Sequence, residues 1–176
     1  MLEIVKQTID FYTKYLKEPT KQDIQAIEAD AFSKKWSCFV TLYKNGEIRG
    51  SAGNIKEIEP SIGEEIIKNT MEAISKDKRF PPITIAEVKD IRIRLDVIEW
   101  RTILEEGKIL GLDPMKSGVI AIKKDYSKLA VVLPNISPKL LTGSDLLSML
   151  EAKLDEKLVE SDYIIYDIKT KVDRNY

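Results

Sequence analysis

The first sixteen residues alternate between apolar and polar positions with the period of an amphipathic helix. The apolar positions are Leu2, Val5, Ile9, Tyr12 and Leu16. Pro19 follows this stretch, and since proline cannot continue a helix, the pattern predicts a helix that ends before it. A second, shorter helix is expected over residues 21–32.

Residues 38–55 alternate with the shorter period of a strand and contain a strong turn signal. Residues 38–43 are predicted to form one strand and residues 47–55 its partner. Asn45-Gly46 is the expected two-residue turn, because both central positions of the favoured hairpin turn need a positive φ. Gly50 and Gly53 interrupt the second strand. Glycine inside a strand usually marks a bulge, or a close approach by a ligand or by another part of the backbone.

A two-residue turn also predicts the register of this hairpin. The directly opposed residues are then Lys44 with Glu47, Leu42 with Arg49, and Val40 with Ser51. Because side chains alternate across a strand, Arg49 and Ser51 are expected to share one face and to point into a groove. That face also carries Cys38, Val40 and Leu42, whereas the opposite face, expected to be core, carries Phe39, Tyr43, Ile48 and Ala52. A bulge at Gly50 would shift the register and move Ser51 to the other face.

Ser61 and Glu64 have the spacing of a capping box, in which the serine hydroxyl accepts from a first-turn amide and the glutamate reaches back. The helix that starts here is expected to run to about Ser75. Its inward-facing residues are expected to be Ile62, Ile66, Thr70, Ala73 and Ile74. Residues 79–82, Arg-Phe-Pro-Pro, then break the chain, because the residue before a proline avoids the helical conformation.

The second half of the chain continues to mix strands and helices. Alternation over 91–97 predicts a half-buried strand, 118–122 and 129–133 a second hairpin, and 163–172 a final strand. A helix is expected around the leucines Leu146, Leu150, Leu154 and Leu158. No regular βαβ rhythm appears, so the expected class is α+β, with mainly antiparallel sheets flanked by helices. A chain of 176 residues with no repeat or linker is expected to form a single domain, 1–176.

Composition narrows the possible partners. Hydrophobic residues make up 43% and charged residues 32% of the chain, which is typical of a globular protein, and the net charge is −1. This balance disfavours an RNA-binding or DNA-binding function, and no nucleic-acid partner is expected. The segment 1–18 lacks a secretory apolar core, and no apolar run approaches the ~18 residues of a membrane span. The expected location is therefore cytoplasmic, without a membrane partner. Abundant Lys, Glu and Ile also suggest a thermophile.

Two absences limit the chemistry. The chain has no histidine and one cysteine, Cys38. A Ser-His-Asp or Cys-His pair, an imidazole-bound metal and an internal disulfide are therefore impossible. A general base would have to be Asp, Glu, Lys or Tyr. The acidic pairs Glu64-Glu65 and Glu105-Glu106 are expected to be solvated, and no metal site or cofactor is expected.

Several segments together resemble the AMMECR family. Phe39-Val-Thr-Leu-Tyr-Lys-Asn-Gly-Glu-Ile-Arg-Gly50 is similar to the family's FVTL…G-x-L-R-G hairpin, and 79–82 to its R-F-P-P segment. Residues 91–97 are similar to the alternating strand that follows, Ser117-Gly-Val119 to H-G-V, and Leu133-Pro-Asn-Ile136 to L-P-Q-V. The resemblance covers nearly the whole chain and implies a larger and a smaller lobe, with a groove between them lined by these motifs. It also implies partners in a modification pathway with Memo-like and radical-SAM proteins.

The chain departs from the family pattern at two positions. The family's R-G-C-I-G reads Arg49-Gly-Ser-Ala-Gly53, and its H-G reads Ser117-Gly118. Ser51 thus stands where a cysteine is usual and Ser117 where a histidine is usual. A serine hydroxyl needs an adjacent base to act as a nucleophile, so no catalytic residue is assigned.

The expected ligand-binding residues come from the hairpin and from the other shared segments. They are Arg49, Gly50, Ser51, Gly53, Asn54, Arg79, Phe80, Pro81, Pro82, Ser117, Gly118, Pro134 and Asn135. Arg49 could clamp a carboxylate or phosphate or form a structural ion pair. The glycines could admit a ligand, although packing is the preferred explanation, and residues 79–82 could be a groove wall or a rigid connector. The last four residues enter only through the resemblance and could be turn chemistry.

Two functions follow from these residues. The first is a binding or accessory module whose groove holds a small anionic ligand or a segment of a partner protein. The second is an enzyme that uses Arg49 to orient its substrate and a carboxylate or lysine as base. The missing Cys and His favour the first.

Overall fold

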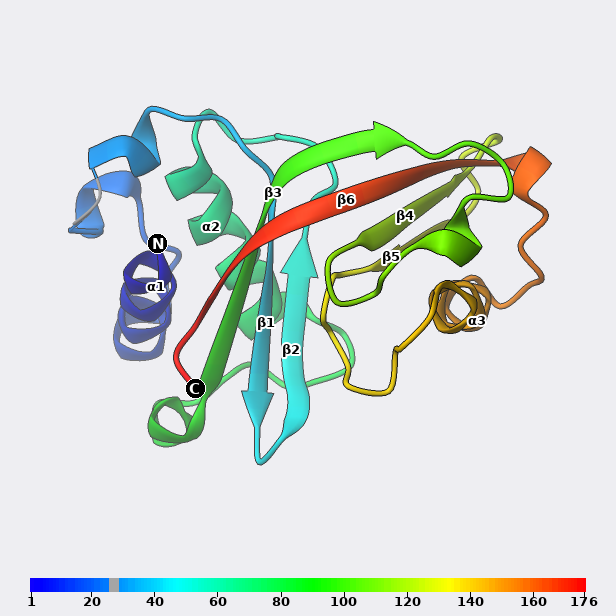
Figure 1. Ribbon diagram of the computed structural model, residues 1–176. Helices are drawn as coiled ribbons and strands as arrows, with labels where there is room; N and C mark the ends of the chain where they lie inside the picture. The colour runs from blue at the N-terminus through cyan, green and yellow to red at the C-terminus, as the bar shows by residue number, and fades with distance from the viewer. Residues whose placement is uncertain (26–28) are drawn as a thin grey trace. The chain divides into compact units, whose positions relative to one another are not determined.

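The computed structural model describes residues 1–25 and 29–176, which in Figure 1 form three α-helices, several short helical turns and six strands. All the strand pairs given below are antiparallel, and the strand order is β2-β1-β3-β6-β4-β5. The chain divides into two compact units, which we call the N-terminal unit (1–97 with 172–176) and the C-terminal unit (98–171). Each unit has its own hydrophobic core. The fold is α+β, as the sequence predicts.

The N-terminal unit packs helices on one face of three strands. Its strands are β1 (Cys38–Lys44), β2 (Glu47–Gly53) and the first half of β3 (Arg92–Ile103). Helix α2 (Ile62–Met71) lies against β1, and α1 (Leu2–Tyr15) packs beside α2 (Figure 1). A π-helical turn, Glu72–Lys76, continues α2 to the end predicted for it. Burial of an apolar stripe on each helix against the sheet holds these layers together.

Helix α2 begins as the capping box predicts. The amide of Glu64 donates to Ser61 Oγ at 3.3 Å, and the Ser61 hydroxyl donates to the Glu64 carboxylate at 2.6 Å. All five residues expected to face inward are buried, namely Ile62, Ile66, Thr70, Ala73 and Ile74. The local cap and the helical period therefore suffice to place this helix.

The single helix expected over 21–32 is wrong for the described residues. Two 3₁₀ turns, Lys21–Asp23 and Ala29–Phe32, occupy its ends, and 26–28 lie outside the described residues. Asp23 accepts hydrogen bonds from the amide and hydroxyl of Thr20, and Ile24 is extended with φ −103° and ψ 119°. The cap at Thr20 thus closes a turn of only three residues, and because the next residue is extended, the helix cannot continue past it.

The hairpin has the predicted turn and a different register. Asn45 and Gly46 have φ values of 55° and 84°, as a two-residue hairpin turn requires. Tyr43 pairs with Ile48, but Leu42 pairs with Gly50, so Arg49 is the extra residue of a β-bulge. The predicted pairs Leu42 with Arg49 and Val40 with Ser51 are therefore wrong.

The bulge moves Ser51 to the other face of the strand, where it pairs with Thr41. It does not share the face of Val40, which pairs with Ala52. The predicted core face is also reversed. Cys38, Val40 and Leu42 are fully buried, whereas Ile48 is 43% exposed. The alternation of residues along a strand assigns them to two faces, but it does not say which of the two faces the helices cover.

Strand β3 is buried on both faces in its first half. Ile91, Ile93, Leu95 and Val97 are buried as predicted. Arg94 and Asp96, expected on a solvated face, are also buried, so the half-buried strand was a wrong prediction. They form a bidentate ion pair, with Nε to Oδ2 at 2.7 Å and Nη2 to Oδ1 at 2.8 Å. Charges that pair in this way can occupy a buried position which neither could occupy alone.

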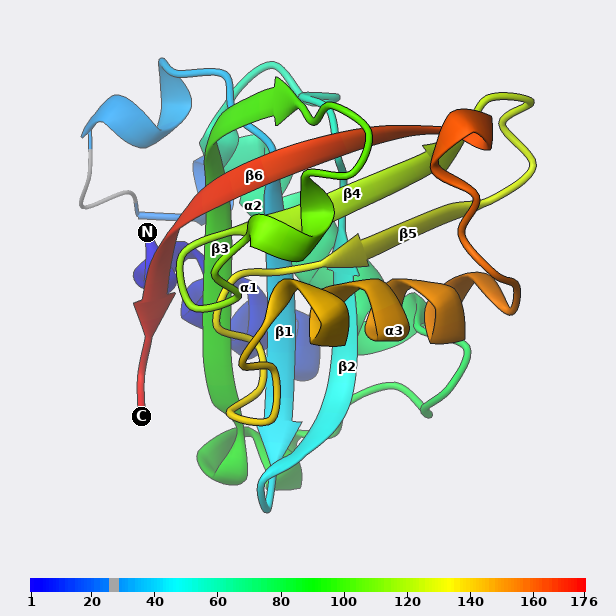
Figure 2. The same ribbon diagram turned by 45° about the vertical axis from the view of Figure 1, so that its right-hand side comes forward.

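The C-terminal unit places one helix on a hairpin. Strands β4 (Gly118–Lys123) and β5 (Leu129–Val132) pair as predicted, and β4 also pairs with β6 (Tyr163–Arg174). Helix α3 (Gly143–Leu154) runs alongside β5 (Figure 2), capped by Thr142 and Asp145. The predicted leucines Leu146, Leu150 and Leu154, together with Leu158 beyond the end of the helix, are buried in the core of this unit. No helix in the described part of the chain is both long and apolar enough to cross a membrane.

Candidate functional site

Arg49 leaves the hairpin at the bulge and is held by a carboxylate. Its Nε and Nη2 donate to Glu87 Oε1 and Oε2 at 3.0 and 3.1 Å, and Lys44 Nζ reaches the same Oε1 at 3.0 Å. The Arg49 side chain is 12% exposed, and its buried Nη1 has no hydrogen-bond partner among the residues that the structure describes. The guanidinium of Arg49 is the main cause that lowers the pKa of Glu87 to about 2, with help from Lys44 and Thr84 and against the effect of burial. The arginine fork is therefore engaged within the fold.

Arg79 is the second arginine of this region, and it is open to solvent. Its side chain is 56% exposed. Nε and Nη2 donate to Asp77 Oδ1 and Oδ2 at 2.9 and 2.6 Å, and Nη2 also donates to Ser51 Oγ at 2.7 Å. Asp77 in addition accepts from the backbone amide of Ser51 at 2.9 Å. Segment 77–79 is thus fastened to β2 at Ser51, through one carboxylate and one guanidinium.

Phe80 lies within cation–π distance of both arginines. Its ring centroid is 5.8 Å from Cζ of Arg49 and 5.3 Å from Cζ of Arg79. Pro81 and Pro82 follow it and are exposed, and Ile83 returns the chain to the core. We call Ser51, Asp77, Arg79 and Phe80 the strand-edge site.

The electrostatics of the strand-edge site follow from this pairing. The hydrogen bonds that Arg79 donates are the main cause that lowers the pKa of Asp77 to about 2; burial opposes them and the amides of Ser51 and Arg79 assist. Asp77 and Glu87 are thus ionised at neutral pH and already hold cations. A carboxylate with such a low pKa is a poor general base.

Asn54 is turned inward, away from any ligand. Its Nδ2 donates to Glu65 Oε1 at 2.5 Å and to Asn69 Oδ1 at 3.2 Å. Glu65 is fully buried, so the prediction of a solvated Glu64-Glu65 pair is wrong for this residue. Glu65 Oε2 also accepts from the amides of Ile58 and Glu59. These donors replace the water that a buried carboxylate loses.

Cys38 lies in the same buried network. Asn69 Nδ2 donates to the carbonyl oxygen and the Sγ of Cys38, at 3.1 and 3.4 Å. The thiol is fully buried, and this burial raises its pKa to about 12. Cys38 is therefore a small buried residue and not a reactive thiol, as the sequence favours.

The two glycines of the hairpin are explained by packing. A Cβ at Gly50 would overlap the carbonyl oxygen of Ala73, so the π-helical turn can approach β2 only at a glycine. A Cβ at Gly53 would overlap the Phe39 ring and would lie 2.7 Å from the carbonyl oxygen of Cys38. Both positions serve close contact within the N-terminal unit.

The other candidate residues belong to the C-terminal unit. Ser117 is 6% exposed, and its amide donates to the carbonyl oxygen of Asp113 at 2.8 Å. A Cβ at Gly118 would lie 2.7 Å from Cδ of Pro134, so these two segments touch. Asn135 has φ 48° and donates its amide to the carbonyl oxygen of Pro114 at 2.8 Å. The predicted groove lined by residues of both units stays a prediction.

Three charged residues of this region were not among the residues predicted for the site, namely Lys44, Asp77 and Glu87. Glu87 pairs with Lys44 and Arg49, and Asp77 pairs with Arg79. Glu87 had a readable signal, because Thr84-x-x-Glu87 has capping-box spacing and Glu87 Oε2 accepts from the amide of Thr84. Asp77 had only its position two residues before Arg79 as a signal, and Lys44 had none, since a tertiary contact brings Glu87 to it. Within the described residues, no group of three Cys, Asp or Glu side chains could hold a metal.

The structure is thus an antiparallel α+β fold with a charged strand edge at β2. The family model AMMECR1 matches residues 2–165, so the chain belongs to the AMMECR1 family. A protein of Thermotoga maritima is 32% identical over 120 residues, which are 66% of this chain and 66% of that protein. Protein CA_C1420 of Clostridium acetobutylicum is 33% identical over 144 residues, 76% of this chain.

The match covers only 30% of the Clostridium protein and just under two thirds of the Thermotoga protein. Among solved structures, the crystal structure of the uncharacterized protein PH0010 from Pyrococcus horikoshii superposes with a TM-score of 0.80. It is 21% identical, and the superposition covers 96% of this chain and 86% of that one. This similarity shows the fold alone. The names of these three proteins state no activity.

Proposed function

We propose that the protein is a cytoplasmic binding or accessory module that recognises an anionic group at the strand-edge site. The group is a carboxylate or phosphate, carried by a small ligand or by a segment of a partner protein. One observation carries the proposal. Ser51 Oγ accepts from Arg79, and the proton of the same hydroxyl has no acceptor among the described residues. An anion that took this proton would also lie beside an exposed guanidinium.

The surroundings of Ser51 favour recognition over catalysis. No base contacts its hydroxyl in the described part of the chain, and Asp77 is committed to Arg79 and two backbone amides. The alternative enzyme function needs a carboxylate or a lysine as base, and Lys44, a lysine of this region, is paired with Glu87. Because Asp77 and Lys44 are both held in ion pairs, neither is placed to take a proton from Ser51. The exposed guanidinium of Arg79 supports recognition of an anion instead.

Thermal shift and calorimetric titration with inorganic phosphate, acetate and citrate test the proposal. At least one anion is expected to raise the melting temperature of the wild type by mass action. Arg79→Met and Ser51→Ala are expected to weaken its binding about tenfold each, the value of a hydrogen bond to a charged group. Lys78→Met removes the neighbouring exposed lysine and is the matched control. Equal weakening by Lys78→Met would mean nonspecific charge attraction and would refute a specific site.

The partner form of the proposal has its own test. The family resemblance implies Memo-like and radical-SAM proteins as partners. A purified Memo-like protein is expected to bind the wild type, and more weakly to Arg79→Met than to Lys78→Met, if an acidic segment reaches Arg79. If anions bind strongly in calorimetry but Arg79→Met does not change the binding of the protein partner, the function would be confined to a small ligand.

A further inference from the structure

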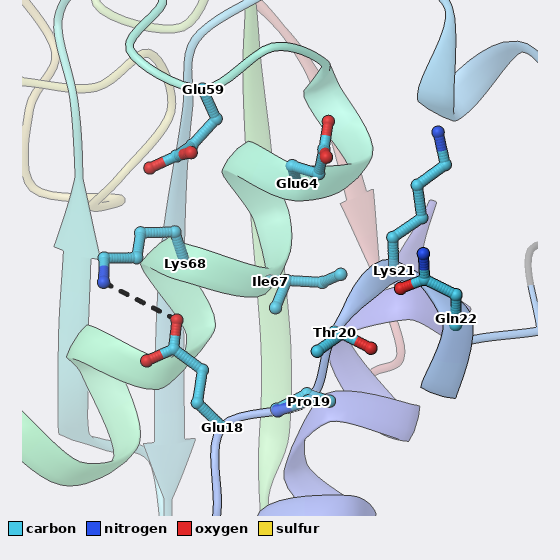
Figure 3. Close-up of a pocket in the computed structure, with 9 residues that line it drawn as sticks. All are labelled: Glu18, Pro19, Thr20, Lys21, Gln22, Glu59, Glu64, Ile67 and Lys68. Carbon is cyan, nitrogen blue, oxygen red and sulfur yellow. Dashed lines mark ion pairs between the residues drawn. The ribbon is translucent and has the colours of Figure 1, made fainter.

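A cleft of about 380 Å³ lies in the N-terminal unit, apart from the strand-edge site (Figure 3). One wall is the segment after α1, from Glu18 to Gln22, and the other is the face of α2 that carries Glu64, Ile67 and Lys68, with Glu59 before the helix. Ile67 projects from α2 between these walls. The volume is that of a site for a small molecule, near the lower end of the usual range. The cleft shares no residue with the strand-edge site.

Both walls of the cleft are held in place by hydrogen bonds from behind. The amide of Glu59 donates to the fully buried Glu65 at 2.8 Å, and this carboxylate is fixed in turn by Asn54 and Asn69. On the other side, the Thr20–Asp23 capping box fixes the turn that carries Lys21 and Gln22. A buried carboxylate costs desolvation energy, and here it secures the loop that carries Glu59 into the cleft.

The charges that line the cleft have both signs. Lys68 Nζ is 3.5 Å from Glu18 and 4.0 Å from Glu72, and all three side chains are well exposed. Such an exposed pair contributes little and exchanges readily for another partner. The carboxylate of Glu59 has no partner among the described residues, and Glu64 accepts only from Ser61 there. The cleft thus offers an exchangeable ammonium at Lys68 and open acceptor oxygens at Glu59 and Glu64.

We propose that this cleft binds a small zwitterion, of the class of free α-amino acids. The ligand's carboxylate takes the place of Glu18 on Lys68, its ammonium group lies between Glu59 and Glu64, and its apolar part contacts Ile67. A ligand with only a negative charge would face three glutamates, and one with only a positive charge would face Lys68 and Lys21. Only a ligand with both charges meets a complementary group at each end.

The test is a binding measurement with amino acids and with analogues that lack one charge. The free α-amino acids are screened by thermal shift on the wild-type protein, and hits are titrated by calorimetry. Norvaline is compared with butylamine and pentanoate, which have its carbon chain without the carboxylate or without the amine. We expect at least one amino acid to raise the melting temperature. Each single-charge analogue is expected to bind about tenfold more weakly or worse.

Two variants with matched controls locate the binding. Glu59→Gln and Lys68→Met each remove one end of the proposed contact and are expected to weaken amino-acid binding about tenfold. Glu3→Gln and Lys78→Met make the same changes on exposed surface elsewhere and are expected to leave it unchanged. Circular dichroism of each variant shows whether it is folded.

Failure of every amino acid to bind in the millimolar range would overturn the proposal. Unchanged binding in both cleft variants, or equal binding of the analogues, would also overturn it. Arg79 does not line the cleft, so Arg79→Met tests the strand-edge site alone. The proposal for either site can therefore be refuted without refuting the other.

Discussion

Arg49 and Arg79 flank the same phenylalanine and each holds one carboxylate, yet they differ in their exposure. The Arg49 side chain is 12% exposed and that of Arg79 is 56% exposed. Arg49 occupies the bulge of β2 and joins it to the turn that carries Glu87. Arg79 pairs with Asp77, only two residues before it, and reaches Ser51. Both arginines are thus bound within the fold, but only the side chain of Arg79 is largely open to solvent.

The comparison shows that similar sequence context does not give similar roles. Both arginines lie in segments shared with the AMMECR1 family, and each is followed by a residue that sequence reasoning assigned to the site. Burial decides between them, because an ion pair shielded from water is costly to break, whereas an exposed one exchanges partners with water and ligands. The recognition role predicted for Arg49 is therefore better suited to Arg79.

The largest effect is expected at Gly50, between Arg49 and Ser51. Gly50→Ala is expected to lower the free energy of unfolding by about 3 kcal/mol, because its Cβ would overlap the carbonyl oxygen of Ala73 and neither backbone can move freely. Denaturant unfolding measures the loss. Gly111→Ala is the control, since nothing lies within 4 Å of a Cβ there. A loss below that of the control would mean that the π-helical turn is not packed on β2 as described.

Arg49→Met is expected to cost about 2 kcal/mol of unfolding free energy. The substitution leaves a largely buried Glu87 with only Lys44 and Thr84 as partners. Anion binding at the strand-edge site should persist in the folded variant. If Arg49→Met instead removed anion binding and left stability unchanged, the assignment of the two arginines would have to be exchanged.

The pH dependence of stability is expected to report the Glu87 pair. The pKa of Glu87 is lowered from 4.5 to about 2, so its ionised form stabilises the fold fully above pH 4.5 and this contribution is lost as the pH falls toward 2. Unfolding free energies of wild type and Glu87→Gln should differ by about 1–2 kcal/mol at pH 6 and converge near pH 2. Glu3→Gln, in an exposed pair with Lys6, is the control. Parallel curves for wild type and Glu87→Gln would contradict the pairing.

The smallest effect on stability is expected for Arg79→Met. Asp77 is only 8% exposed and loses its main partner, but it keeps the amides of Ser51 and residue 79 as donors. The free energy of unfolding should therefore fall by about 1 kcal/mol, less than for Arg49→Met. The same variant is expected to show the largest loss of anion binding, so stability and binding separate the two arginines. A destabilisation as large as that of Arg49→Met would show that Arg79 is structural as well.

Local signals in the sequence were enough for most secondary structure. The Asn45-Gly46 turn, the Ser61-Glu64 cap, the leucine helix and the second hairpin all occur where the pattern predicts them. Each depends on residues close in sequence, so no tertiary contact was needed to predict it. The helix over 21–32 failed because its cap closes on one turn, and this outcome depends on the extended conformation of Ile24.

The candidate site was predicted only in part. Ser51, Arg79 and Phe80 were named from the sequence and lie together in the structure. Asp77 and Glu87, which hold the two arginines, were not named. Glu87 pairs with Arg49 because the fold brings the two side chains within about 3 Å, and no local pattern carries that distance.

The sequence alone determined the class of fold, the hairpin turn, the absence of imidazole chemistry and the family. Each of these depends on composition, periodicity or short motifs. Only the tertiary structure decided the bulge at Arg49, the buried face of β1 and the burial of Arg94, Asp96 and Glu65. One extra residue in a strand exchanges its two faces, and a charge can be buried only where distant groups supply its partners. For that reason the fold could be read from the chain, whereas the roles of its two arginines required the structure.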